Sequence, residues 1–62
     1  MIDAEDSLRN ALRALREREM FSRELSEHFA TTGDTVAQRR EEDDARRAAH
    51  AAEFLQSMLL EK

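Results

Sequence analysis

The stretch RREEDDARR, residues 39–47, places four consecutive carboxylates between two pairs of arginines. A carboxylate metal site on a helical bundle needs inward-facing acids one turn apart, with Glu-x-x-His spacing. Consecutive acids instead fan around a helix, and three residues before His50 stands Arg47. We therefore expect no metal site and no cofactor, but a solvated helix surface or a charged docking face. Its expected i, i+4 ion pairs are Arg39 with Asp43, Arg40 with Asp44, Glu42 with Arg46 and Asp43 with Arg47.

Arg9, Arg13 and Arg16 are spaced i, i+4 and i+7, so they form one row along a helix. Such a row can contact phosphates, and phosphate neutralisation supplies much of the affinity for nucleic acids. Surrounding acids leave the row weakly basic, and the chain has no Tyr or Trp to stack on bases. RNA or DNA binding through this row is therefore the alternative, and a solvated or partner-binding row is favoured.

The two histidines are expected to be packing residues: His28 follows Glu24 by four positions and precedes Phe29, and His50 stands among alanines. The serines show no His and acid at spacings that would make a nucleophile. A single glycine cannot form a phosphate-binding glycine loop. We expect that the chain is not an enzyme.

Length and composition point to self-association. Sixty-two residues allow one small domain, residues 1–62, and such domains usually need disulfides, a metal or oligomerisation. The chain has no cysteine, which leaves oligomerisation as the expected route. A net charge of −4 gives no general attraction to nucleic acid or anionic lipid. The start, MIDAEDSL, lacks a signal-peptide core, and no run approaches a membrane span. We expect a cytoplasmic protein, and nine arginines to one lysine suggest a bacterial source.

Two helices are predicted by the capping residues around the only glycine, Gly33. Gly33 can adopt the left-handed conformation that ends a helix. Asp34 or Thr35 can cap the next helix, and Thr35 with Gln38 has capping-box spacing. Asp3 can cap the first helix. The expected fold is an all-α antiparallel two-helix hairpin, with helices at about 3–31 and 35–60 and the turn at Thr32–Asp34; one long helix through Gly33 is the alternative.

Apolar residues recur along both helices in a pattern close to coiled-coil heptads. Folding the chain at Gly33 places Leu15 opposite Ala51 and Phe21 opposite Ala45. Two helices cannot enclose all of this apolar surface, so we expect a homodimeric four-helix bundle. The expected core and dimer interface consists of Leu8, Leu15, Phe21, Leu25, Phe29, Leu55, Met58 and Leu59. Candidate partner-binding residues are Arg9, Arg13, Arg16, Phe54 and Leu60.

The segment LREREMFSRELSEHF, residues 15–29, resembles the signalling helix and phospho-acceptor box of sensor histidine kinases. That box reads Ser-His-Glu followed by an apolar residue, whereas here Glu27 precedes His28 and no proline follows. The resemblance implies a dimerisation module of the helical-hairpin type, with His28 as the phosphate acceptor. The matching residues are Phe21, Glu24, Leu25, Ser26 and Phe29.

The sequence therefore predicts a non-enzymatic protein–protein interaction and oligomerisation module. It would act as a small regulator, as an adaptor or as the oligomerisation piece of a larger protein, with itself and another protein as partners. The alternatives are an RNA- or DNA-binding regulator and a dimerisation or phosphotransfer module like those of sensor histidine kinases.

Overall fold

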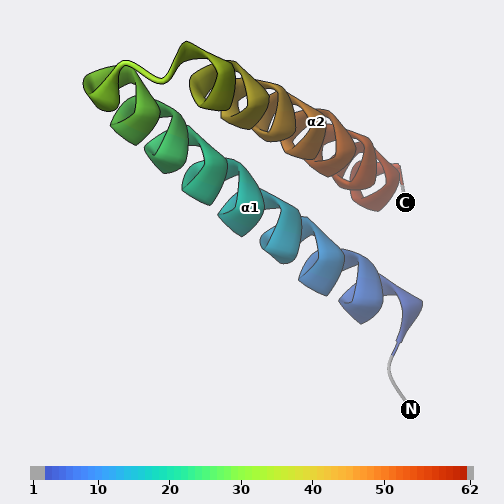
Figure 1. Cartoon of the computed structure of the whole chain (residues 1–62). Coiled ribbons are helices and arrows are strands. Elements are labelled where there is room, and N and C mark those ends of the chain that lie inside the picture. The colour runs from blue at the N-terminus through green and yellow to red at the C-terminus, as the bar shows by residue number, and fades with distance from the viewer. Residues whose placement is uncertain (1–2, 62) are drawn as a thin grey trace.

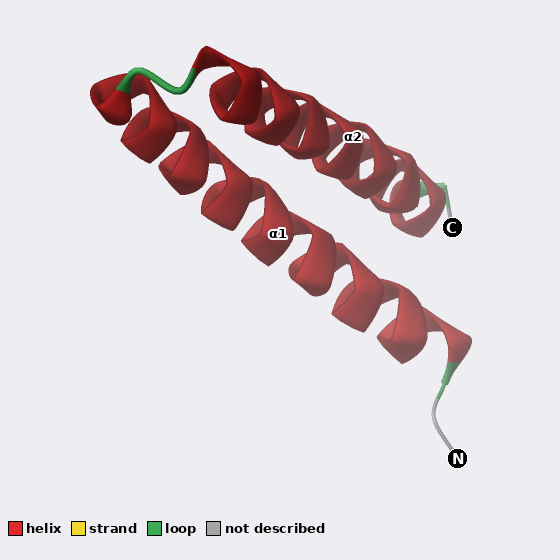
Figure 2. Ribbon diagram, in the orientation of Figure 1, coloured by secondary structure: helices red, strands yellow, loops and turns green. Residues whose placement is uncertain are grey.

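The computed structural model describes residues 3–61 and shows two helices lying side by side (Figure 1). Helix α1 comprises Ala4–Thr32 and helix α2 comprises Thr35–Leu60. They run antiparallel, so the start of α1 and the end of α2 lie at the end of the hairpin opposite the turn (Figure 1). Between the helices only a short turn is non-helical (Figure 2). The expected all-α hairpin is confirmed, and each expected helix end lies within one residue of the observed one.

Gly33 ends α1 through the left-handed conformation expected of it, with φ of 82°. Its N–H donates to the carbonyl of Ala30 at 3.3 Å, and the N–H of Asp34 donates to the carbonyl of Phe29 at 3.0 Å. These two bonds form a Schellman motif, which satisfies carbonyls that the helix end would otherwise leave unpaired. A β-carbon at Gly33 would meet nothing within 4 Å, so the backbone conformation, and not crowding, favours glycine here.

Aspartates cap both helices. The Asp3 carboxylate accepts the N–H of Glu5 at 3.4 Å, and the Asp34 carboxylate accepts the N–H of Ala37 at 3.0 Å. Of the two residues expected to cap α2, Asp34 is therefore the one that does so. The expected capping box of Thr35 and Gln38 is wrong, because Asp34 is the N-cap and Thr35 is already the first helical residue; the side chain of Gln38 donates to Glu42 at 3.1 Å.

The strip where α1 and α2 contact, here called the seam, is built from small residues. Only alanines and serines are buried, and no large side chain among residues 3–61 is fully buried. Small side chains let two helix backbones approach closely, and larger ones then flank the contact. The buried residues are Ser22, Ser26, Ala45, Ala48 and Ala52. The half-buried apolar residues beside them include Leu8, Leu12, Leu15, Leu25, Phe29, Leu55 and Leu59.

The expected pairing of Phe21 with Ala45 is wrong, because Phe21 is 61% exposed and Ser22 and Ser26 are buried in its place. Likewise Ala51 is exposed, while its neighbour Ala52 is buried. The seam of α1 follows an uninterrupted heptad pattern at positions 8, 12, 15, 19, 22, 26 and 29, which keeps the expected Leu8, Leu15 and Phe29 but has Ser22 and Ser26 where Phe21 and Leu25 were expected.

The lengthwise register is close to the expected one. The Ser26 hydroxyl donates to the Glu42 carboxylate of α2 at 3.5 Å. Folding the chain at Gly33 would place Arg40 opposite Ser26, so the observed partner lies two residues further along.

The hairpin is elongated and thin. Its Cα atoms span 46 × 21 × 11 Å, and their radius of gyration is 14.3 Å, against about 11 Å for a compact chain of this length. One pair of helices thus forms a single layer with two broad sides. Neither α1 nor α2 contains an apolar stretch long enough to cross a membrane.

Replacing Gly33 with alanine should lower the free energy of unfolding by about 1 kcal/mol, because a side chain disfavours the left-handed backbone. The matched control is Gly33→Asn, which tolerates this conformation better and should lose less. Urea denaturation of all three proteins at one concentration measures the difference. Equal losses in both variants would contradict the backbone explanation.

Replacing Ala52 with leucine should destabilise the hairpin by about 1–3 kcal/mol, because Ala52 is 0% exposed and the seam has no room for a larger side chain. The exposed Ala30 provides the control, since Ala30→Leu adds the same atoms outside the seam. Thermal unfolding followed by circular dichroism compares the two. A variant Ala52→Leu as stable as Ala30→Leu would refute the close approach of the helices.

Candidate interaction surface

In the structure, the acids of residues 39–47 point to different sides of α2. The carboxylate of Glu42 lies beside Ser26, whereas Asp44 lines a groove on the opposite side of the seam. The expected i, i+4 ion pairs are replaced by two i, i+3 pairs. Arg46 donates to Asp43 at 3.1 Å, and the charged groups of Arg47 and Asp44 are 3.7 Å apart.

The direction of helical side chains explains why Arg46 and Arg47 pair with acids whereas Arg39 and Arg40 do not. Side chains on a helix lean toward its N-terminus, so Arg46 and Arg47 reach back one turn to the aspartates. Arg39 and Arg40 would have to reach forward, and they form no ion pair within residues 3–61. Within the same residues, no three histidine or carboxylate side chains converge as metal ligands.

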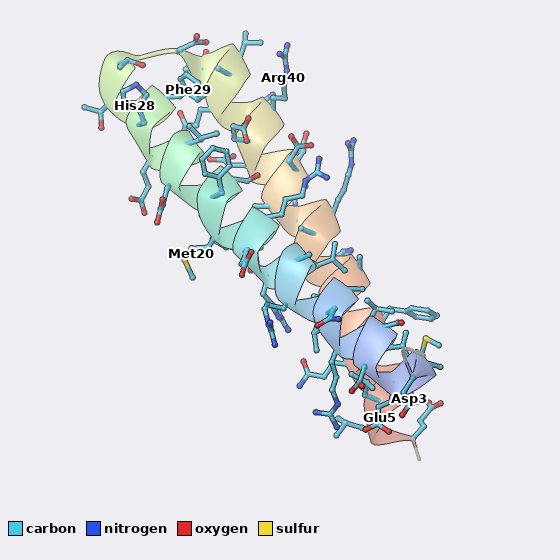
Figure 3. All side chains as sticks on the ribbon, turned by 90° about the horizontal axis from the view of Figure 1, so that it is seen from below. Asp3, Glu5, Met20, His28, Phe29 and Arg40 are labelled. Carbon is cyan, nitrogen blue, oxygen red and sulfur yellow. The ribbon has the colours of Figure 1, made fainter. Side chains whose placement is uncertain are left out.

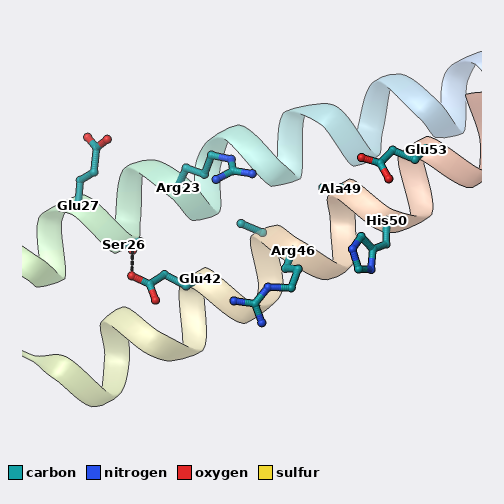
Figure 4. A pocket seen from close by; sticks show the side chains of 9 residues that line it. Arg23, Ser26, Glu27, Glu42, Arg46, Ala49, His50 and Glu53 are labelled. Carbon is teal, nitrogen blue, oxygen red and sulfur yellow. Dashed lines mark hydrogen bonds between the residues drawn. The ribbon is translucent and has the colours of Figure 1, made fainter.

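One broad side of the hairpin carries a groove that we call the polar groove (Figure 4). Side chains of both charge signs line it along both helices, and the Ser26–Glu42 hydrogen bond crosses it. His50, which the sequence did not connect to any site, is exposed on its α2 wall. A groove of mixed charge suits a polar protein segment better than a phosphate backbone. Its lining consists of Arg23, Ser26, Glu27, Glu42, Ala45, Arg46, Ala49, His50 and Glu53.

The arginine row at the start of α1 is largely neutralised by its own helix. Arg9 donates to Glu5 at 2.7 Å, and this hydrogen bond raises the pKa of Arg9. Arg16 donates to Glu19 at 3.1 Å and to Gln56 of α2 at 3.2 Å. Arg13 is exposed. Two of the three arginines therefore hold glutamates of their own helix.

Glu19 is a half-buried ion-pairing residue of the seam that the sequence analysis missed. It lies on the seam between Leu15 and Ser22, and its side chain is only 17% exposed. Arg23 donates to one carboxylate oxygen at 3.0 and 3.2 Å, and Arg16 donates to the other. These hydrogen bonds, first from Arg23 and then from Arg16, lower the pKa of Glu19. The regular seam spacing through position 19 is the signal that could have revealed it.

On the other broad side, Leu15, Arg18, Asp44, Arg47 and Ala48 line a second groove. Helical spacing places a heptad row of each helix along this groove, and we call the two rows together the apolar face. The α1 row is Ser7, Ala11, Ala14, Arg18, Phe21 and Leu25, with Phe29 of the seam beside its end, and the α2 row is Ala37, Arg40, Asp44, Arg47, Ala51, Phe54 and Met58.

The structure brings together only part of the expected interface. Phe21, Phe54 and Met58 are exposed on the apolar face, and Leu25 and Phe29 are half-buried at its edge with the seam. Leu8, Leu15, Leu55 and Leu59 are half-buried between the helices.

Two exposed residues lie apart from the apolar face. Leu60 is exposed but does not join Phe54, because six residues turn a helix by about 240°. His28 is exposed next to the turn, and its ring meets Phe29 edge-on with centroids 5.6 Å apart.

No protein family, curated protein or solved structure matches this chain. The interpretation of its surfaces therefore depends on their own geometry and chemistry.

Acid should weaken the hairpin through Glu19. Its pKa is lower folded than unfolded, so the stabilisation is present above the unfolded pKa of about 4 and is lost as pH falls through the folded pKa. A Glu19→Gln variant should therefore lose less stability than the parent between about pH 6 and about pH 3. Urea denaturation across this range measures the loss.

The control is Glu17→Gln, at an exposed residue that forms no ion pair within residues 3–61. Its pH profile should match that of the parent. If the Glu19→Gln profile also ran parallel to the parent's, the pairing of Glu19 would have no role in stability.

Proposed function

We propose that the chain is a non-enzymatic self-association and protein-interaction module, in which two hairpins pair into a four-helix bundle. The exposed apolar face is the observation that carries this proposal. Phe21 and Phe54 are 61% and 66% exposed, whereas the buried residues among 3–61 are all alanines and serines. Large aromatic side chains contribute most to stability when they are buried, so burial of Phe21 and Phe54 by a second copy would stabilise the dimer.

The exposed area supports the same conclusion. The hairpin exposes 4956 Å², whereas a compact monomer of 7.2 kDa exposes about 4,100 Å². The excess, about 800 Å², equals what each partner buries in a stable protein–protein interface of ordinary size. Pairing through one broad side would bring the exposed area per chain to that of a compact protein.

A bundle of this kind would offer its remaining charged surface to another protein, as a regulator or an adaptor does. Arg39, which lies outside the apolar face, forms no ion pair within the described part of the chain, so its charge is available to an acidic partner. The polar groove would stay on the outside of the bundle. The exposed Leu60 lies outside the apolar face and offers the other protein an apolar contact.

The nucleic-acid alternative has less support. Arg9 and Arg16 already donate to glutamates, so a phosphate would have to compete with a carboxylate for each of them. The kinase-like alternative is supported only by the exposure of His28 and by the hairpin itself. Phosphate transfer to His28 from a kinase, absent in a His28→Gln variant, would distinguish it.

Self-association predicts a mass of about 14 kDa in solution at tens of micromolar, twice the 7.2 kDa of the chain. Because the dimer is favoured by mass action, its melting temperature should rise with protein concentration. Sedimentation equilibrium and thermal unfolding at several concentrations measure both. A 7.2 kDa species whose melting temperature does not depend on concentration would overturn the proposal.

A further inference from the structure

We infer that the second copy packs on the apolar face in antiparallel orientation, with α1 against α1 and α2 against α2. The turn of each hairpin then lies beside the end of the other hairpin where α1 begins and α2 ends. This inference rests on the proposed self-association and adds the face and the orientation. It follows from the sizes and charges of the side chains along the two rows of the apolar face.

The choice of face follows from the contrast between the two broad sides. In the polar groove, the side chains of Glu27, Glu42 and Glu53 would have to lose their hydration on pairing, and the apolar lining consists only of alanines. Burial of unpaired charge is costly. The apolar face instead presents Phe21 and Phe54, whose burial is favourable.

The orientation follows from the distribution of side-chain size along α1. Its row has small residues in the N-terminal half and large ones in the C-terminal half, with Arg18 in the middle. When two such rows meet antiparallel with Arg18 at the two-fold axis, each large residue faces a small one, as close packing requires. The facing pairs are Phe21 with Ala14, Leu25 with Ala11 and Phe29 with Ser7, and each pair occurs twice by symmetry.

The α2 row fits the same axis. Arg18 and Arg47 line the same groove, so an axis at Arg18 also passes close to Arg47. By the register of the Ser26–Glu42 contact, Arg18 lies level with His50, so Phe54 faces Arg47 of the other copy. An arginine over an aromatic ring is a favourable contact.

The other two-fold arrangement, with the turns at the same end, places α1 against α2 of the second copy. By the register of the Ser26–Glu42 contact, Leu25 would then face Asp44, so an apolar side chain would bury a carboxylate. Either arrangement brings arginines together at the centre, where their long side chains can reach solvent at the rim. The central arginines therefore do not distinguish the two arrangements. The residues on either side of these arginines do distinguish them.

Two adjacent residues test the face. Phe21 and Met20 are 61% and 63% exposed in the single hairpin, but Met20 points away from α2 (Figure 3) and lies outside the apolar face. Phe21→Glu should raise the dimer dissociation constant by at least about 30-fold, because it buries an unpaired charge at two symmetric positions. Met20→Glu should change it less than about threefold. Sedimentation equilibrium measures both, and circular dichroism confirms that the helices persist.

Two spin-label positions test the orientation, and the chain has no cysteine to interfere. Glu17→Cys and Thr31→Cys place single labels on exposed positions outside the apolar face. In the antiparallel dimer, the labels at position 31 should lie about 40 Å apart, because each is 13 residues from the axis at 1.5 Å per residue. The labels at position 17, next to the axis, should lie within about 20 Å. Pulsed electron–electron double resonance measures both distances.

Each outcome has a separate meaning. Similar distances at both positions would overturn the orientation and favour the arrangement with the turns together. A dimer that survives Phe21→Glu, or is lost in Met20→Glu, would overturn the choice of face while leaving self-association intact. A parent chain that stays monomeric at tens of micromolar would overturn the proposed function itself.

Discussion

The close contact of α1 and α2 through small residues determines most of what the hairpin exposes. With Ser22 and Ser26 against Ala45, Ala48 and Ala52, the two backbones leave no space for an aromatic side chain between them. The bulky residues must then lie beside the seam or outside it. An apolar surface remains exposed for this reason, although the chain has enough apolar residues for a core.

Polar groups along the seam fix how the helices are aligned. Glu19 is held by two arginines of its own helix, and one of them, Arg16, also binds Gln56 across the hairpin. Ser26 and Glu42 form a second contact between the helices nearer the turn. An alanine-rich contact alone would let α1 and α2 shift lengthwise against each other, because the alanines along the contact are nearly interchangeable. The hydrogen bonds favour one lengthwise register.

The helix ends could be predicted from the sequence because local chemistry decides them. Gly33 and Asp34 act within a few residues of themselves, and no distant contact is needed to place them. The seam could not be identified in the same way. Two heptad rows run along α1 one residue apart, both contain apolar residues, and the row through Phe21 and Leu25 is not the one that faces α2. Hydrophobicity ranks such rows, but it does not say which neighbour each of them meets.

The local character of the turn also has a consequence for the order of folding. The hydrogen bonds that reverse the chain join residues between Phe29 and Ala37, so they can form before any contact between the far ends of the helices. The two helices can then extend from the turn toward the open end, in steps that each close only a short loop. Chains dominated by such near-neighbour contacts fold in microseconds to milliseconds. In the proposed dimer, the encounter of two folded hairpins would then be the slow step, and its rate would depend on protein concentration.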